Sequence, residues 1–161
     1  MVNLKSRYKY EFRKAWAWPE PVEKFIASLL VSPSLHVCCG ESTLGDVRVD
    51  IKTKADIQAD AFHLPFRDEV FASVVSDPPW HMSYNLRPKF AKEIYRVLRP
   101  GGIFILNSPW ALGLTHTMRL EAVYYALPSS WRNCPLIILY RKTQNTLPSP
   151  SSPHSISTNS L

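Results

Sequence analysis

The sequence predicts an α/β fold of three layers, in which helices cover both faces of a mostly parallel sheet that ends in an antiparallel edge hairpin. Short apolar runs alternate with two segments in which apolar residues recur at intervals of three and four, a pattern typical of strands between helices. The last two apolar runs, 121–127 and 136–142, leave no room for a helix between them, which indicates an antiparallel pair at one edge of the sheet.

Both helices are indicated by their apolar spacing and by proline. The first helix begins at Pro19 and Pro21, and Ser32-Pro33-Ser34 ends it. The second helix is expected over 89–98, and Pro100-Gly101-Gly102 is expected to stop it before the next strand.

The strands are predicted from apolar runs, most of which end at a small or acidic residue. Their expected ranges are 35–39, 47–51, 55–59, 71–76 and 103–107, followed by the two edge runs. Only ten positions separate Gly40 from Asp50, so a short loop is expected in place of a helix between the first two strands.

Length and composition indicate one cytoplasmic domain with a segment added at each end. The chain has 161 residues, which fits a single domain. We expect a basic N-terminal arm at 1–14, a central domain at 15–142 and a flexible Ser/Pro-rich tail at 143–161, which has no Lys, Arg, Asp or Glu. No apolar run is long enough to span a membrane, and no signal peptide is visible. The three cysteines, two of them adjacent, indicate reduced thiols, and no His/Cys spacing fits a metal site.

The net charge of +6 is unevenly distributed along the chain. Residues 1–14 carry five basic side chains and one acidic, and residues 87–99 do the same. Residues 15–86 carry ten acidic side chains and five basic. An acidic centre therefore lies between basic segments that could contact a polyanion, although solvated faces would give the same pattern.

Four residues at predicted strand ends indicate one ligand crevice, because open α/β sheets bind ligands at the carboxyl ends of their strands. They are Gly40, Asp50, Asp60 and Asp77. A carboxylate at Asp50 can accept from both hydroxyls of a ribose, and Asp60 could hold an adenine or amine edge. Gly40 lets the backbone approach a ligand closely. Each of these residues alone is common in turns, so the ligand crevice is indicated only by their occurrence together at successive strand ends.

The loop after the first strand does not suit a phosphate. It reads Cys-Gly-Glu-Ser-Thr-Leu-Gly over 39–45, without the second glycine of a dinucleotide-binding loop, and Glu41 would repel an anion. A nucleoside without phosphates fits better. S-adenosylmethionine is such a molecule, and its sulfonium cation suits the acidic centre.

The strongest local signal is Asp77-Pro78-Pro79-Trp80, which follows a buried apolar run. Its two prolines have no N–H, so the turn presents only acceptors, namely the carboxylate and neighbouring carbonyls. Such acceptors suit an amino group on a planar ring, because bonds from both N–H groups free the nitrogen lone pair for attack on a methyl group. Trp80 can stack on the planar substrate. Asn107 and Trp110 could line the same pocket, whereas Trp18 is interpreted as a core residue.

With these motifs, residues 15–142 resemble the class I, Rossmann-like S-adenosylmethionine-dependent methyltransferases. Four segments are similar to the family's cofactor motifs and to its Pro-Gly-Gly turn: Leu35-His36-Val37-Cys38-Cys39-Gly40, Val49-Asp50-Ile51, Ala59-Asp60-Ala61-Phe62, and residues 96–102. The Asp-Pro-Pro-Trp turn is similar to that of the amino-methyltransferases that modify N6 of adenine or N4 of cytosine. The first loop departs from the family, which usually has Gly-x-Gly there.

The resemblance implies S-adenosylmethionine as cofactor, no metal, and a set of site residues. The cofactor-binding residues would be Cys39, Gly40, Asp50, Ile51, Asp60, Ala61 and Asp77. The catalytic residues would be Asp77, Pro78, Pro79 and Trp80.

The expected reaction is methyl transfer to an amino nitrogen of a nucleic acid, with adenine N6 in DNA or RNA first. Because no separate target-recognition region is visible, a specificity subunit is a further candidate partner. Three alternatives stay open: a protein glutamine-amide methyltransferase, a small-molecule N-methyltransferase, and a catalytically silent subunit that uses the fold for binding.

Overall fold

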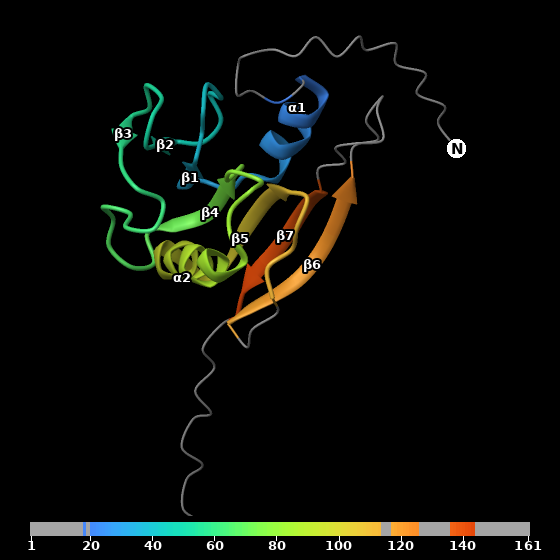
Figure 1. Ribbon diagram of the computed structural model, residues 1–161. Coiled ribbons are helices and arrows are strands. Elements are labelled where there is room, and N and C mark those ends of the chain that lie inside the picture. Colours follow the sequence, from blue (N-terminus) through green and yellow to red (C-terminus); the bar gives the residue numbers. More distant parts are fainter. Residues whose placement is uncertain (1–17, 19, 114–116, 126–135, 144–161) are drawn as a thin grey trace, which may run out of the picture.

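The computed structural model describes residues 18, 20–113, 117–125 and 136–143, and within these residues a seven-stranded sheet carries helices on both faces (Figure 1). The strand order is β3-β2-β1-β4-β5-β7-β6. The strands are β1 (Ser34–Val37), β2 (Val47–Asp50), β3 (Ile57–Gln58), β4 (Phe71–Ser76), β5 (Leu98–Ser108), β6 (Met118–Tyr125) and β7 (Leu136–Lys142). The helices are α1 (Glu20–Leu29), the short 3-10 helix η1 (Tyr84–Leu86) and α2 (Arg87–Val97).

Parallel pairing joins the first five strands, and antiparallel pairing adds the last two. β1 pairs with β2 and β4, β2 pairs with β3, and β4 pairs with β5, all in parallel. β7 lies antiparallel between β5 and the edge strand β6. The predicted fold class, a mostly parallel sheet with an antiparallel edge pair, is therefore confirmed.

The sheet is covered on both faces because successive residues of its central strands point in opposite directions. On one face, α2 packs Phe90, Ile94 and Val97 against the sheet. On the other face, Ile26 of α1 packs in a second cluster with Val75 of β4. The three layers predicted from the sequence are thus formed with one helix on each face (Figure 1).

The predicted stop at Pro100-Gly101-Gly102 is wrong. The chain leaves α2 at Val97 and becomes extended at Leu98, which already pairs with Phe71 of β4. The Pro-Gly-Gly segment therefore lies inside β5, where the register to β4 shifts and Gly101 has a φ of 75°. The helix also begins at Arg87, earlier than expected, because the preceding η1 leads directly into it.

Three strand bounds also differ from the prediction. β1 ends at Val37, so both adjacent cysteines belong to the following loop. β3 covers only 57–58 of the expected 55–59, and β6 begins at Met118 where 121 was expected. A strand ends where its backbone loses a hydrogen-bonded neighbour, and hydropathy alone does not show that point.

The predicted terminal segments lie largely outside the described residues. This holds for the basic arm at 1–14 and for the tail at 143–161 apart from residue 143. Within the residues that the structure does describe, no helix is long and apolar enough to cross a membrane.

A short loop joins β1 to β2, as the spacing predicted, and no helix forms over 38–46. The loop is braced where it returns to the sheet. The backbone N–H and the hydroxyl of Ser34 donate to Asp46 Oδ2 at 2.8 and 3.0 Å, and the Asp46 N–H donates to the Ser34 hydroxyl at 2.9 Å. These bonds hold the first residue of β1 beside the last residue of the loop.

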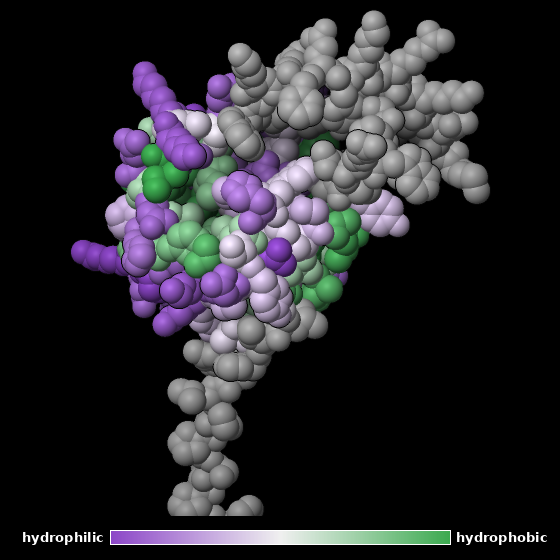
Figure 2. All heavy atoms as spheres, viewed as in Figure 1, coloured by the Kyte–Doolittle hydropathy of each residue, from purple (hydrophilic) through white to green (hydrophobic). Residues whose placement is uncertain are grey.

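The edge strand β6 exposes several large side chains. Leu120, Val123, Tyr124 and Tyr125 are each at least 40% exposed. Figure 2 shows hydrophobic residues along this edge of the molecule.

Gly102 provides a test of the close contact between β4 and β5. A Cβ atom at this position would lie 2.9 Å from the carbonyl oxygens of Ala72 and Arg99. Because both are backbone atoms of packed strands, we expect Gly102→Ala to lower the free energy of unfolding by about 1–3 kcal/mol in urea denaturation. Gly113→Ala is the matched control, since nothing lies within 4 Å of its added Cβ. Equal unfolding midpoints for the two variants would contradict the interpretation.

Candidate functional site

The register of the sheet aligns the carboxyl ends of four neighbouring strands. Val37 of β1 pairs with Val49 of β2 and with Ser76 of β4. Ser76 pairs in turn with Leu106 of β5. The next residues along these strands form one row across the end of the sheet: Cys38, Asp50, Asp77 and Asn107.

Asp50 braces the loop after β1. Its Oδ2 accepts from the Gly40 N–H at 3.0 Å, and its Oδ1 accepts from the N–H groups of Lys52 and Thr53 at 2.8 and 3.0 Å. Partial burial alone would raise the pKa of this carboxyl, but the three backbone donors outweigh burial and lower it. Asp50 is therefore ionised at neutral pH, and one oxygen retains capacity for a further donor. The neighbouring Ile51 side chain is 58% exposed.

The first loop has a left-handed backbone at two positions, Cys38 with a φ of 57° and Gly40 with a φ of 55°. The sequence has glycine at only the second position, yet the backbone adopts at both the conformation that glycine favours. For a residue with a side chain this costs about 1–2 kcal/mol. Burial raises the pKa of the Cys38 thiol to about 12, so it is not ionised, and Cys39 is buried beside it.

Asp60 and Ala61 lie in the turn after β3. Asp60 Oδ1 accepts from the Phe62 N–H at 2.9 Å, and Oδ2 lies 3.3 Å from His63 Nδ1. Ala61 and Phe62 pack against the core on the α2 face of the sheet. The Asp60 carboxyl thus forms its bonds within its own turn and is still 44% exposed.

Asp77 is the most perturbed carboxyl of the row. Burial raises its pKa to about 6, although the Trp80 indole, the Asn107 amide and the Trp18 indole each favour the ionised form. The Trp80 Nε1–H donates to Asp77 Oδ1 at 3.0 Å. Pro78 is buried and Pro79 is exposed, and neither has an N–H to donate.

Asn107 and Trp18 contribute to this site more than the sequence indicated. Asn107 is 2% exposed, and its Oδ1 has no hydrogen-bond partner in the described structure. The Trp18 Nε1 is also buried without a well-formed hydrogen bond, although the indole lies near enough to the Asp77 carboxyl to lower its pKa. The Trp18 ring stacks on His36 with centroids 5.0 Å apart. A signal for Asn107 was present in the spacing, because Asn107-Ser-Pro-Trp110 repeats the pattern of Asp77-Pro-Pro-Trp80.

Trp110 joins the two Trp-containing turns. Its Nε1–H donates to the main-chain oxygen of Trp80 at 3.0 Å. The turns after β4 and β5 are therefore connected by a direct hydrogen bond beside the Asp77 carboxyl.

Comparison with known proteins supports the same fold and names a family. Residues 35–106 match the family described as "Methyltransferase domain". No curated protein sequence matches the chain. The matched stretch covers slightly less than half of the chain. It runs from the second residue of β1 to Leu106 of β5, and thus contains three of the four residues of the row.

Solved structures resemble this chain at low sequence identity. The N-methyltransferase NodS from Bradyrhizobium japonicum WM9 is 14% identical with a TM-score of 0.61, over 78% of this chain and 98% of that one. TrmN from Thermus thermophilus is 18% identical with a TM-score of 0.58, over 76% of this chain and 47% of that one. A protein solved in a study of the conversion of a disulfide bond into a thioacetal group during echinomycin biosynthesis is 15% identical, with a TM-score of 0.59 and coverage of 80% and 83%. These likenesses concern the fold.

S-adenosylmethionine is the cofactor expected for a methyltransferase domain of this kind, and NodS has also been solved in complex with S-adenosyl-L-homocysteine. The strand-end residues fit this cofactor. The left-handed backbone at Cys38 and Gly40 turns the chain sharply at the end of β1, and the Gly40 N–H donates to Asp50. The carboxylate of Asp50 would accept from a ribose hydroxyl, and the exposed Ile51 beside it offers an apolar surface to a base.

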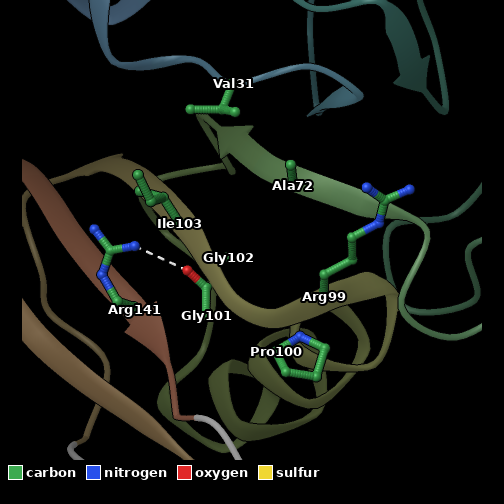
Figure 3. A pocket seen from close by; sticks show the side chains of 8 residues that line it. All are labelled: Val31, Ala72, Arg99, Pro100, Gly101, Gly102, Ile103 and Arg141. Carbon is green, nitrogen blue, oxygen red and sulfur yellow. Dashed lines mark hydrogen bonds between the residues drawn. The ribbon is translucent and has the colours of Figure 1, made fainter.

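A cavity of about 210 Å³ lies away from this site. Figure 3 shows its lining, which includes Arg99, Gly101 and Arg141. Arg141 donates to the Gly101 carbonyl at 2.8 Å and pairs with Glu121. The cavity is at the end of the sheet where β4 begins, so it is opposite the row of Asp50 and Asp77. Among the described residues, no group of three or more His, Cys, Asp or Glu could hold a metal ion.

Asp50 provides a test of the cofactor site. Asp50→Ala removes the charged acceptor and releases the Gly40 N–H, so we expect affinity for S-adenosylmethionine to fall roughly 10-fold or more in isothermal titration calorimetry. Asp56→Ala is the control, because Asp56 pairs with Arg48 on the surface and is not in the row. Circular dichroism should show that both variants stay folded. Unchanged affinity in the Asp50 variant would exclude this residue from the cofactor site.

Proposed function

We propose that the protein transfers the methyl group of S-adenosylmethionine to an amino nitrogen on a planar base of a nucleic acid, adenine N6 first. The observation that carries the proposal is the Asp77–Trp80 turn at the end of β4, with a buried carboxyl and no N–H on the two residues that follow it. The row that contains Asp77 also contains Asp50 and Cys38, so the acceptor lies at the same end of the sheet as the proposed cofactor residues.

The residues of the turn can activate a weak nucleophile. When bound, the cofactor supplies an electrophilic methyl group on a sulfonium sulfur. An amino nitrogen conjugated to a ring attacks poorly because its lone pair is delocalised. Asp77 would accept a hydrogen bond from one N–H, and the Pro78 carbonyl is a second candidate acceptor. Both bonds favour a pyramidal nitrogen with an available lone pair.

The reaction balances within this set of groups. A nitrogen–carbon bond forms as the sulfur–carbon bond breaks, and its electron pair stays on sulfur as a thioether. The methylated nitrogen then loses one proton. With a pKa of about 6, Asp77 is ionised at neutral pH and is more basic than an exposed aspartate, so it can take that proton.

Two features support a nucleic acid as the substrate class. Trp80 offers an indole beside the acceptor, as pockets for extruded bases do. Residues 87–92, which follow η1 directly, carry three basic side chains and no acidic one, so the phosphates of a nucleic acid could bind close to the turn. The proposed partners are therefore DNA or RNA, with a specificity subunit as a further candidate.

A small-molecule substrate is the second candidate function. It is favoured by the likeness to a protein solved in a study of echinomycin biosynthesis, although that likeness is one of fold. Radiolabelled transfer onto DNA, RNA, protein and small-molecule pools in parallel separates the candidates. We expect label in a nucleic-acid pool. Label in the protein or small-molecule pool alone would overturn the nucleic-acid proposal, and absence of cofactor binding would favour a silent subunit.

Substitution of Asp77 tests its role in transfer. Asp77→Ala removes the acceptor, and we expect kcat to fall at least about 100-fold while S-adenosylmethionine still binds. Asp77→Asn keeps an acceptor oxygen and should lose less. Initial rates with labelled cofactor, together with calorimetry, provide the measurement. A fully active alanine variant would show that the carboxyl has no part in the reaction.

The pH dependence of transfer should follow the ionisation of Asp77. Protonation removes its best acceptor and its capacity as a base, so the rate should fall as pH decreases through about 6. The residual activity of Asp77→Asn should not fall in this pH range, since an amide does not titrate. Rates measured between pH 5 and 8 for both proteins provide the comparison. The same fall in rate at low pH in both proteins would show that a group other than Asp77 is being protonated.

The same shift predicts that the folded state is less stable with Asp77 ionised. Because burial raises the native pKa to about 6 from 3.8, the folded chain holds this proton more tightly than the unfolded chain. The resulting stabilisation is present below pH 3.8 and is lost as pH rises through about 6. We expect Asp77→Asn to exceed the wild type by about 1–3 kcal/mol in urea denaturation at pH 8, with a smaller gap near pH 4. A gap that does not change with pH would contradict the assigned shift.

A further inference from the structure

A stack of aromatic and guanidinium groups extends from the Asp77–Trp80 turn. Trp110 is bonded to the main chain of Trp80. The guanidinium carbon of Arg87 lies 4.3 Å from the centroid of the Trp110 ring and 5.7 Å from that of Tyr84. The Arg87 Nε–H donates to the Met82 carbonyl at 3.3 Å, which orients the guanidinium. We refer to Trp110, Arg87 and Tyr84 as the stack.

Tyr84 is the exposed end of the stack. Its side chain is 82% exposed, the highest value among the large hydrophobic residues of the described surface. Trp110 packs against the core and is explained by folding alone, but Tyr84 is not. An aromatic ring held at the surface beside an oriented guanidinium offers a planar face to a ligand.

The charge around the stack favours an anionic ligand. Residues 81–92 include Arg87, Lys89 and Lys92 and no acidic side chain. The first acidic residue that follows, Glu93, accepts two bonds from Arg96 and is therefore paired. A planar face beside basic side chains is the arrangement by which proteins hold successive bases and phosphates of an unpaired strand.

We propose that the stack binds the nucleotide adjacent to the target base on an unpaired strand of nucleic acid. This rests on the proposed function, because the target base is taken to lie at Asp77. The Trp80 indole donates to Asp77 and the Trp80 carbonyl accepts from Trp110, so one residue connects the stack to the acceptor. A duplex keeps its bases stacked on each other and offers no free face to Tyr84, so the substrate class is unpaired rather than paired strands.

Binding without cofactor tests this surface directly. Fluorescence anisotropy would follow a labelled single-stranded DNA of about 16 nucleotides, and a duplex of the same sequence. We expect Tyr84→Ala to weaken binding of the single strand roughly 5- to 100-fold, and Tyr84→Phe to keep the wild-type affinity, because stacking needs the ring alone.

A charge-conserving substitution separates stacking from simple attraction. Arg87→Lys keeps the charge but loses the planar group, so affinity should fall while the dependence of affinity on salt stays the same. Arg99→Lys is the matched control, because Arg99 lines the cavity at the opposite end of the sheet (Figure 3). The affinity of this variant for the single strand should equal that of the wild type.

The outcomes distinguish this inference from the proposed function. Equal affinity of the wild type and Tyr84→Ala for the single strand would overturn the inference, as would an equal loss for the duplex. Methyl transfer to nucleic acid with the same KM in both proteins would overturn the inference and leave the proposed function in place. A Tyr84-dependent affinity with no methyl transfer to any nucleic acid would overturn the proposed function, and would support the stack as a binding surface for an unpaired strand.

Discussion

The position of the candidate site depends on the parallel register of β4 with the strands on either side. Ser76 pairs with Val37 and with Leu106, and its hydroxyl also donates to the Val37 carbonyl at 2.7 Å. A slip of one residue would turn the Asp77 side chain to the opposite face of the sheet. The register is held mainly by burial, since Val74 and Val75 are fully buried on opposite faces of β4. The apolar core therefore sets the geometry of the polar row.

Two carboxyl groups in that row have opposite electrostatic environments. Asp50 accepts from three backbone N–H groups and has a lowered pKa, so it is a permanent anion that holds a loop. Asp77 is buried more deeply, and its pKa is raised to about 6 despite the indole donors around it. A difference of this kind between neighbouring carboxyls is how a site assigns one of them to binding and the other to proton chemistry.

Much of the fold could be predicted from hydropathy and spacing, because buried strands and amphipathic helices leave different periodicities in the sequence. The strand through Pro100-Gly101-Gly102 could not be predicted, since those residues usually end an element. Here they lie where the register shifts, between Leu98 and Ile103, which both pair with β4. For the site, the turn at Asp77 could be predicted from its own residues. Asn107 could be predicted to line the same pocket, but its contact with the Asp77 carboxyl could not, because that depends on β5 lying beside β4. The left-handed backbone of Cys38 leaves no signal in a cysteine side chain.

The concentration of indoles at one end of the sheet also has an optical consequence. The chain has five tryptophans, and Trp18, Trp80 and Trp110 lie around the Asp77 carboxyl or the turn that carries it. Indole emission shifts with the polarity of its surroundings, and stacking on a nucleobase quenches it. The protein therefore contains its own reporter of occupancy, and its intrinsic fluorescence can follow ligands into this region without an attached label.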